Sequence, residues 1–230
     1  QSAASIATMM SDVVNNLEIV KNELGFVYWP QYGVNGIGNM VPGEGYLLKM
    51  FNADTLLYAP NTASFSKSNI IQNEKYFYKN VKNTGSNMTL GIPKTSWETE
   101  PLIGSEIGIF CSDSNVGEKL IGSSVYVGEN LAIAIWGNDE HTAENDGLNE
   151  GEKFVLRIWS NEVETYLEIK NWLEGNEFYK TNKISIAKKL SITNSQLSIP
   201  ELCQNTPNPF NKISEISFNI PNATFVEIET

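Results

Sequence analysis

The 230-residue chain has little of the side-chain chemistry on which most enzymes depend. It contains one histidine, His141, and two cysteines, Cys111 and Cys203. A catalytic triad would have to use His141, and no Gly-x-Ser-x-Gly elbow presents a serine nucleophile. The two cysteines exclude a disulfide framework but leave a single bridge open, and neither lies near His141 in the sequence, which argues against zinc. We therefore expect a protein that is not an enzyme.

Basic residues and long apolar runs are also scarce. Lysine and arginine total 16 against 27 acidic residues, and Arg157 is the single arginine, so the formal net charge is -11. This balance argues against nucleic-acid partners and anionic membrane surfaces, and it suits a secreted protein or a cation-binding surface. No run approaches the ~18 apolar residues that a membrane-spanning helix needs, so we expect no membrane insertion.

The first residues do not read as a targeting segment. Residues 1–3 lack the charged start and the apolar stretch of a signal peptide. An exported protein needs such a peptide. We therefore expect Gln1 to be a mature start, a proteolytic start or a fragment boundary.

Hydrophobic periodicity predicts a mainly β chain with one short helix near its start. In residues 2–14, Ile6, Met9, Met10 and Val13 fall at helical spacing. Beyond this segment, short apolar runs bounded by turn residues predict strands. In the first unit the expected strands cover residues 17–20, 26–29, 46–50 and 55–58.

The larger second unit continues the strand pattern. Short runs recur at a spacing of roughly 8–15 residues with glycines at the turns, which is typical of a sandwich or a barrel. We predict an antiparallel β-sandwich-like domain. Its expected strands cover residues 76–81, 88–92, 106–110, 120–126, 131–136, 154–159, 164–169 and 183–187.

Composition changes along the chain predict five segments. Polar runs rich in Asn, Ser and Lys mark the linkers. The predicted division is a small β module with an N-terminal helix at 1–60, a linker at 61–72, the sandwich-like domain at 73–192, a second linker at 193–204, and an extended C-terminal segment at 205–230.

The loop at residues 137–152 is the sharpest candidate for a metal site because it is dense in hard oxygen donors. Calcium takes six to eight such ligands and tolerates irregular loops, although the Asp-x-Asp-x-Asp-Gly core of an EF-hand is missing here. Two interpretations stay open: a calcium site, and a solvated acidic hairpin loop that turns at residues 146–147. The calcium ligands would be Asp139, Glu140, Asp146 and Glu152.

Aromatic residues are the other binding candidates, because exposed rings stack on sugars. Tyr28 and Trp29, followed by Pro30, form the best candidate for an exposed ligand-binding patch. Trp136 and Trp159 each end an apolar strand run, so we expect them in the core or at its rim.

The C-terminal segment combines a proline-fixed hook with a strand. Each proline fixes its own φ and pushes the preceding residue towards extended geometry, so residues 205–211 should be stiff and extended. Residues 215–220 alternate apolar and polar side chains, which predicts a half-buried strand. The hook consists of Asn205, Thr206, Pro207, Asn208, Pro209, Phe210 and Asn211.

This hook and strand closely resemble the start of the type A C-terminal sorting domain of the type IX secretion system, which Bacteroidetes use to export proteins across the outer membrane. The family pattern is QNxPNPFN followed by a strand of the form TxISFxLP, and the chain reads Gln204 to Asn211 and then Glu215 to Pro221. The resemblance implies export, a secreted or cell-surface location and contact with the secretion machinery. Asn205, Pro207, Asn208, Pro209, Phe210 and Asn211 would be the sorting signal.

The first unit also resembles a small repeat module of secreted Bacteroidetes multidomain proteins. The matching residues lie at 20–22, 27–30, 32–35, 37–39 and 42–46. That module usually begins with a further strand before the helix. The resemblance therefore implies an open sheet edge that a neighbouring chain could fill to give filaments. Residues 104–110, 136–139 and 156–159 of the second unit resemble a module that often precedes such sorting domains.

We expect the non-catalytic C-terminal region of an exported protein with a structural, adhesive or filament-forming role. Its partners would be the secretion machinery and either further copies of the chain or surface glycans. The alternative is a carbohydrate-binding accessory module of a larger secreted enzyme. A hydrolase in its own right would need paired carboxylates about 5–10 Å apart in a cleft, and no pair among the 27 acids stands out in the sequence.

Overall fold

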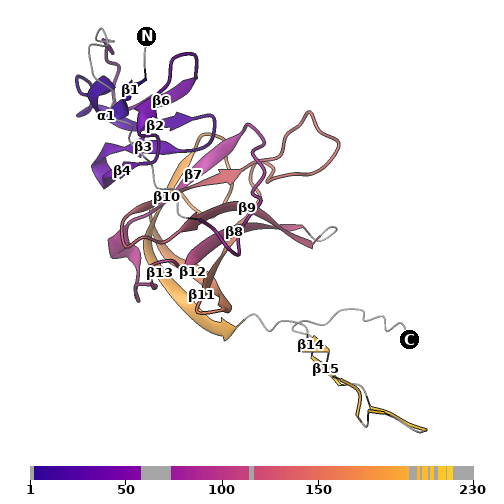
Figure 1. The fold of residues 1–230 in the computed structure, drawn as a ribbon. Helices are drawn as coiled ribbons and strands as arrows, with labels where there is room; N and C mark the ends of the chain where they lie inside the picture. Colours follow the sequence, from indigo (N-terminus) through magenta and orange to yellow (C-terminus); the bar gives the residue numbers. More distant parts are fainter. Residues whose placement is uncertain are drawn as a thin grey trace.

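The computed structural model describes residues 3–57, 74–113 and 117–196, and in the C-terminal segment 201–202, 204–206, 208–209, 212–215 and 217–219. Within these ranges the chain is mainly β, which confirms the predicted fold class. An N-terminal β module packs against a larger curled sheet (Figure 1). None of the helices in the described ranges is long and apolar enough to cross a membrane.

The N-terminal module is a four-stranded antiparallel sheet covered by a short helix. The sheet order is β4-β3-β2-β6, and the separate pair β1-β5 lies beside helix α1 (Ile6–Met9). Ile6 and Met10 pack with Leu17 and Val20 of the sheet in one apolar cluster. The strands are β1 (Ala4–Ser5), β2 (Leu17–Asn22), β3 (Val27–Trp29), β4 (Val34–Asn35), β5 (Asn39–Met40) and β6 (Tyr46–Met50), with a 3-10 turn, η1 (Pro30–Tyr32), after β3.

The helix is shorter than the periodicity of residues 2–14 predicts. It ends at Met9, and turns follow up to Asn16. Ser11 donates its hydroxyl to the Thr8 carbonyl at 2.9 Å. Short polar side chains of this kind offer the backbone an alternative to the helical ladder, so the segment turns early.

The larger unit is one seven-stranded sheet in the order β10-β7-β13-β12-β11-β8-β9. Every ladder is antiparallel except β13–β7, which is parallel and joins the last strand to the first. A 3-10 turn, η2 (Lys94–Ser96), follows the first strand. The strands are β7 (Asn87–Ile92), β8 (Glu106–Asp113), β9 (Gly117–Val125), β10 (Leu131–Trp136), β11 (Phe154–Ser160), β12 (Val163–Glu174) and β13 (Ile184–Gln196).

The sheet curls until its two edge strands, β9 and β10, meet. A Cβ atom on Gly122 would lie 2.5 Å from the carbonyl oxygen of Ala134, so only glycine permits this approach. No ladder joins β9 to β10 among the strands that the structure describes. The result is a closed apolar interior with a seam that lacks hydrogen-bonded pairing.

Alternation along the strands fills this interior, as the sequence pattern predicts. Residues 131, 133 and 135 of β10 and residues 154, 156 and 158 of β11 are buried, while the residues between them are only partly covered. Cys111 is a free, buried thiol in the same cluster. Cys203 lies outside the described residues.

Two predicted strands are absent, and one predicted linker is partly strand. Residues 55–57 and 76–81 are not in strands, whereas β13 continues to Gln196 into the range expected to be a linker. Residues 74–84, which we call the strap, cross the outer face of β8. The backbone amides of Tyr76, Phe77 and Tyr78 bond to the Glu106 side chain and not to a neighbouring strand. Residues 76–81 therefore combine apolar and polar side chains like a strand, but they do not pair with a neighbouring strand.

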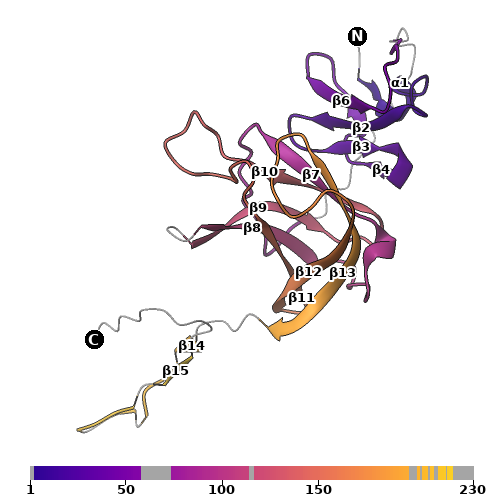
Figure 2. The ribbon, with the colours of Figure 1, turned by 180° about the vertical axis from the view of Figure 1, so that it is seen from behind.

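Trp29 joins the two units. Its side chain is 2 % exposed and packs with Ile184 and Ile186 of β13. A Cβ atom on Gly91 would lie 2.7 Å from the indole ring, so the ring rests directly on the β7 backbone. In both views the N-terminal module sits on the part of the sheet that β7 and β10 form (Figures 1 and 2).

Polar contacts frame this apolar junction. Lys21 donates from Nζ to the Asn87 carbonyl at 3.0 Å and to Asn182 Oδ1 at 2.9 Å. Asn130 donates to the Tyr32 carbonyl at 2.7 Å. Burial lowers the pKa of Lys21 from 10.5 to about 8, because water no longer solvates its ammonium group fully.

Replacing Gly91 with alanine should destabilise the chain. The added methyl group must displace the Trp29 ring, which costs about 1–3 kcal/mol of unfolding free energy. Gly45→Ala is the matched control, because a Cβ atom there meets nothing within 4 Å and should change the stability by less than about 0.5 kcal/mol. Urea denaturation measures both. Equal stabilities for the two variants would contradict the junction.

The Lys21 amine should make stability rise with pH. The folded chain gives up this proton near pH 8 while the unfolded chain holds it to 10.5, so unfolding takes up protons in that window. Urea midpoints should increase from pH 7 to about 9.5, and Lys21→Met should flatten this rise. A variant with the same pH slope as the unchanged chain would rule out the interpretation.

Candidate functional site

A groove of about 630 Å³ lies where the strap, the N-terminal module and the β9–β10 edge of the sheet meet. Its volume falls in the range of ligand sites, which are common at junctions between modules. One wall consists of the β2–β3 turn at residues 24–26 and of β4 with its flanking glycines at residues 33–36. The opposite wall is the strap, through Lys75, Val81 and Asn83.

The floor is the seam between β9 and β10. Ser123 and Val125 line it from β9, and Ala132 and Ala134 line it from β10. Ile133 also lines the groove, although it belongs to the apolar interior of the sheet. Consecutive residues of β10 thus line the groove, which runs along this strand.

The lining carries almost no charge. Among the described residues that line the groove, Lys75 is the ionisable side chain, and none is Asp, Glu, His or Cys. Lys75 Nζ donates to Ser123 Oγ at 2.8 Å, and burial lowers the pKa of Lys75 although Glu106 opposes the shift. The described lining can recognise a ligand by its shape, its backbone and hydroxyl groups and one cation.

A buried carboxylate holds the strap in place. Glu106 is 1 % exposed and accepts hydrogen bonds from the backbone amides of Phe77 and Tyr78, at 3.1 and 2.8 Å, as well as from that of Tyr76. Three successive N–H groups around one anion form a backbone nest. Hydrogen bonds to a charged acceptor are stronger than neutral ones, so the strap is a fixed wall.

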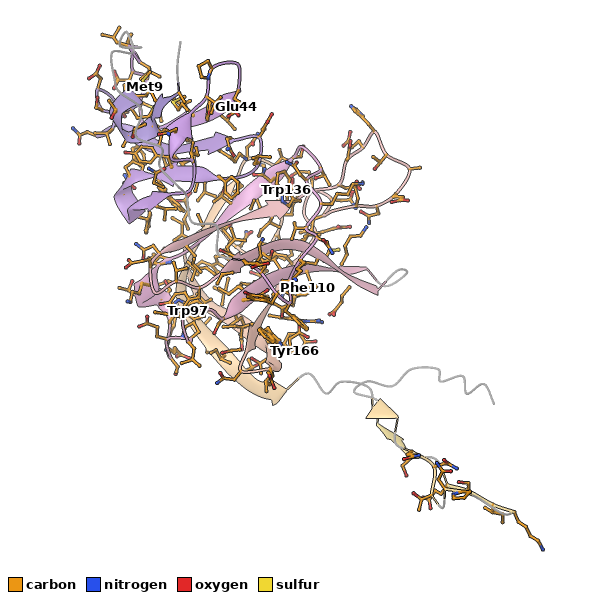
Figure 3. The ribbon with its side chains drawn as sticks, in the orientation of Figure 1. Met9, Glu44, Trp97, Phe110, Trp136 and Tyr166 are labelled. Carbon is orange, nitrogen blue, oxygen red and sulfur yellow. The ribbon has the colours of Figure 1, made fainter. Side chains whose placement is uncertain are left out.

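Tyr78 extends this network to the single arginine. The Tyr78 hydroxyl donates to Glu164, and Glu164 and Glu118 both pair with Arg157. Burial and then the Glu164 carboxylate raise the pKa of Tyr78 well above its ordinary value. The guanidinium lies 4.5 Å from the centroid of the Phe110 ring and 5.3 Å from that of Tyr166, on the strands that flank β11 (Figure 3).

The acidic loop uses Asp146 as a structural group. Asp146 is 3 % exposed, accepts from the Asp139 amide at 2.9 Å and pairs with Lys82 at 2.6 Å. Burial alone would raise the pKa of Asp146, but the Asp139 amide and Lys82 hold it below its usual value. Lys82 thereby ties the strap to this loop.

The other predicted calcium ligands of the loop do not form a cluster with Asp146 in the described ranges. Glu140 and His141 are exposed, and Glu152 accepts from the Asn149 backbone and side-chain amides. In the described ranges no three His, Cys, Asp or Glu side chains are placed to hold one metal ion. The calcium set of Asp139, Glu140, Asp146 and Glu152 stays a prediction.

The expected exposed patch at Tyr28 and Trp29 is wrong. Tyr28 is 8 % and Trp29 2 % exposed, because the first packs in the module core and the second in the junction. Tyr76 and Phe77 are among the exposed aromatic residues instead, and Phe77 stacks on Trp159 with centroids 5.4 Å apart. These two residues fall in the strand predicted at 76–81, and the sequence does not single them out as exposed.

The structure describes three of the six sorting residues. Asn205 donates to Ser214 Oγ at 2.9 Å, and Thr206 and Glu215 exchange backbone hydrogen bonds. Strands β14 (Glu201–Leu202) and β15 (Phe218–Asn219) pair antiparallel on either side, so part of the strand predicted at 215–220 is present. Asn208 and Pro209 are also described, whereas Pro207, Phe210 and Asn211 lie outside the described residues.

Comparisons with protein-family models, with curated proteins and with solved structures found no match to this chain. The groove and its walls are therefore interpreted from their own geometry and chemistry.

Neutralising the buried carboxylate should release the strap. Glu106→Gln keeps the size of the side chain but weakens three charge-assisted hydrogen bonds, which costs about 1.5–3 kcal/mol. Amide hydrogen exchange at residues 76–78 should accelerate by about tenfold or more. The control Glu168→Gln changes an exposed acid on β12 and should leave those amides unchanged. Unchanged exchange in Glu106→Gln would contradict the role of the nest.

Proposed function

We propose that this chain is the non-catalytic C-terminal region of an exported protein, with a structural or adhesive role at the cell surface or outside the cell. The observation that carries the proposal is the groove. It is about 630 Å³ in volume, and its described lining consists mainly of apolar and small polar residues with Lys75 as a cation. A concave site of this size and composition is typical of ligand binding.

The junction between the units also supports a structural role. Trp29, Lys21 and Asn130 connect the N-terminal module to the curled sheet by apolar packing and hydrogen bonds. Asn83 of the strap donates to the Glu23 carbonyl at 3.0 Å, which connects the two walls of the groove. Contacts of this kind hold the two units in one arrangement and keep the groove between them in one shape.

Self-association is one route to that role. β6 is an edge strand that pairs only with β2 in the described sheet. Leu47 on β6 is 50 % and the following Phe51 51 % exposed. An unpaired edge with apolar side chains is a template for a strand from another chain.

Export is the second half of the proposal. It is supported by the hook sequence from Asn205 to Asn211 and by its likeness to a type A sorting domain. The hook would present fixed, extended backbone to the secretion machinery, with Phe210 as its apolar anchor.

A carbohydrate-binding accessory module is the second candidate. It is favoured by the exposed Phe77 ring, which is 50 % exposed and stacks parallel to Trp159, with Tyr76 68 % exposed beside it. Aromatic faces of this kind stack on sugar rings. A glycan titration of the unchanged chain separates the two candidates, because only the alternative requires a sugar to bind.

Disrupting the hook should block export. The chain is expressed behind a signal peptide and a reporter in a bacterium with a type IX system. We expect surface reporter from the unchanged chain and periplasmic retention of a Pro207→Ala, Phe210→Ala double variant, because the stiff backbone and the anchor are both lost. Surface labelling and cell fractionation measure the distribution.

Pro42→Ala is the control, because Pro42 is exposed and lies in the N-terminal module. It should be exported like the unchanged chain. Surface delivery of the double variant at the unchanged level would disprove the assignment of the hook.

A further inference from the structure

The structure assigns a second binding site, for one carboxylate group carried on a ring, to the pocket between the η2 turn, β12 and β13. The pocket has a volume of about 300 Å³, at the lower end of the range of ligand sites. Its described lining consists of residues 95–98, Asn171 of β12, and Lys188 and Lys189 of β13, and it shares no residue with the described lining of the groove. The site therefore goes beyond the proposed function and is tested independently of it.

Two hydrogen bonds attach the η2 segment to β13 on either side of the lysine pair. Ser96 donates its hydroxyl to the Ala187 carbonyl at 2.8 Å, and the Glu98 amide donates to the Leu190 carbonyl at 2.9 Å. Between these two bonds, Trp97 forms a parallel bridge with Leu190 (Figure 3). One wall of the pocket is therefore fixed by the backbone of β13.

Irregular pairing places both lysines on the solvent side of β13. The register between β12 and β13 shifts on either side of Asn171, which lies opposite Lys189, and Lys188 is the extra residue at one of these shifts. Regular alternation would direct two successive side chains to opposite faces. Here Lys188 and Lys189 are both exposed, while the neighbouring Ala187 is buried. Bulges re-aim side chains in this way and are common beside functional sites.

Three hydrogen-bond donors of the pocket have no protein acceptor. The side chains of Thr95, Asn171 and Lys188 make no hydrogen bond or ion pair within the described part of the chain. They supply a hydroxyl, a carboxamide and an ammonium group, which suit a ligand with more than one acceptor oxygen. A carboxylate has two such oxygens, and hydrogen bonds to an ionised acceptor are stronger than those to a neutral one.

The charge of the lining suits a single negative charge. Lys189 is already paired with Glu98 at 2.7 Å, so the Lys188 ammonium is the cation left to balance a ligand. One carboxylate neutralises this excess. A phosphate dianion would instead add a second negative charge beside Glu98.

Trp97 favours a ring as the group that carries the carboxylate. Its half-buried indole packs on the apolar interior of the sheet and meets the Tyr126 ring edge-on with centroids 5.6 Å apart, so its orientation is fixed. The same residue lines the pocket. Flat groups pack well against an indole, so the ligand is an aromatic acid or a sugar acid.

Titration of the isotope-labelled chain with benzoate, followed by NMR, tests the site. We expect the backbone resonances of Trp97 and Lys188 and the Trp97 indole resonance to shift and to saturate in the millimolar range. Benzamide is the matched probe, because it has the same ring without the charge, and should bind about tenfold more weakly or less. Equal binding of benzamide, or no saturable shift at these residues, would overturn the inference.

Further probes identify what carries the carboxylate. Tighter binding of glucuronate than of benzoate would assign the pocket to a sugar acid, and the reverse order would assign it to an aromatic acid; either supports the site. If acetate or inorganic sulfate bound as tightly as both, the ring would contribute nothing and the inference would fail.

Two lysine substitutions locate the site. Lys188→Gln removes the unpaired ammonium group and should weaken benzoate binding by about fivefold or more. Lys180→Gln is the matched control, because Lys180 is exposed and is not part of the pocket lining, and it should leave binding unchanged. Equal effects of the two variants would overturn the assignment to this pocket.

A third substitution tests the charge argument in the opposite direction. Glu98→Gln removes the carboxylate that occupies Lys189 and should tighten benzoate binding by about threefold or more. Weaker binding by this variant, with folding unchanged by circular dichroism, would contradict the charge argument. These substitutions lie outside the groove and the hook, so failure of the pocket leaves the proposed function to its own tests.

Discussion

The contact between Trp29 and the backbone at Gly91 is the constraint on which the rest of the structure depends. The indole is buried in the junction, and the β7 strand can accept it only because residue 91 has no side chain. This contact fixes the N-terminal module over the seam of the curled sheet. The groove exists because the module stands there, so the candidate site is a product of packing between two units that each have their own apolar core.

Buried charged side chains hold individual segments in place by hydrogen bonds and ion pairs. Glu106 gathers three backbone amides, Asp146 binds Lys82, and Arg157 links β8, β11 and β12 through rings and carboxylates. Each charge has its partner, which is the condition under which a buried charge is tolerated. Glu106 and Lys82 both act on the strap, which has no ladder of its own in the described ranges. The strap is therefore held in place by hydrogen bonds and an ion pair with charged side chains, and not by pairing with a strand.

Strand alternation predicted most of the fold, because the side-chain period of a strand is visible in the sequence. The predicted bounds of β6 and β10 agree with the observed ones, and the other strands of the large sheet overlap with their predicted ranges. The prediction failed for the strap, whose alternation is the same but whose amides bond to one carboxylate. The site itself was not predictable from the sequence, since Phe26, Lys75 and Val125 line one groove only because of the tertiary junction. From its local sequence, Trp29 is predicted to be an exposed binding residue for the same reason. The strand that covers it, β7, is about 60 residues away in the sequence, so no local pattern shows the burial.

The most direct test of the fixed junction is the relative orientation of the two units in solution. Residual dipolar couplings of the backbone amides in residues 3–57 and 74–196 measure it in one partially aligned sample. A single alignment tensor that fits both ranges with the orientation seen in Figure 1 is the predicted result. Two tensors of different magnitude would show that the units move independently, and would contradict both the junction and the preformed groove.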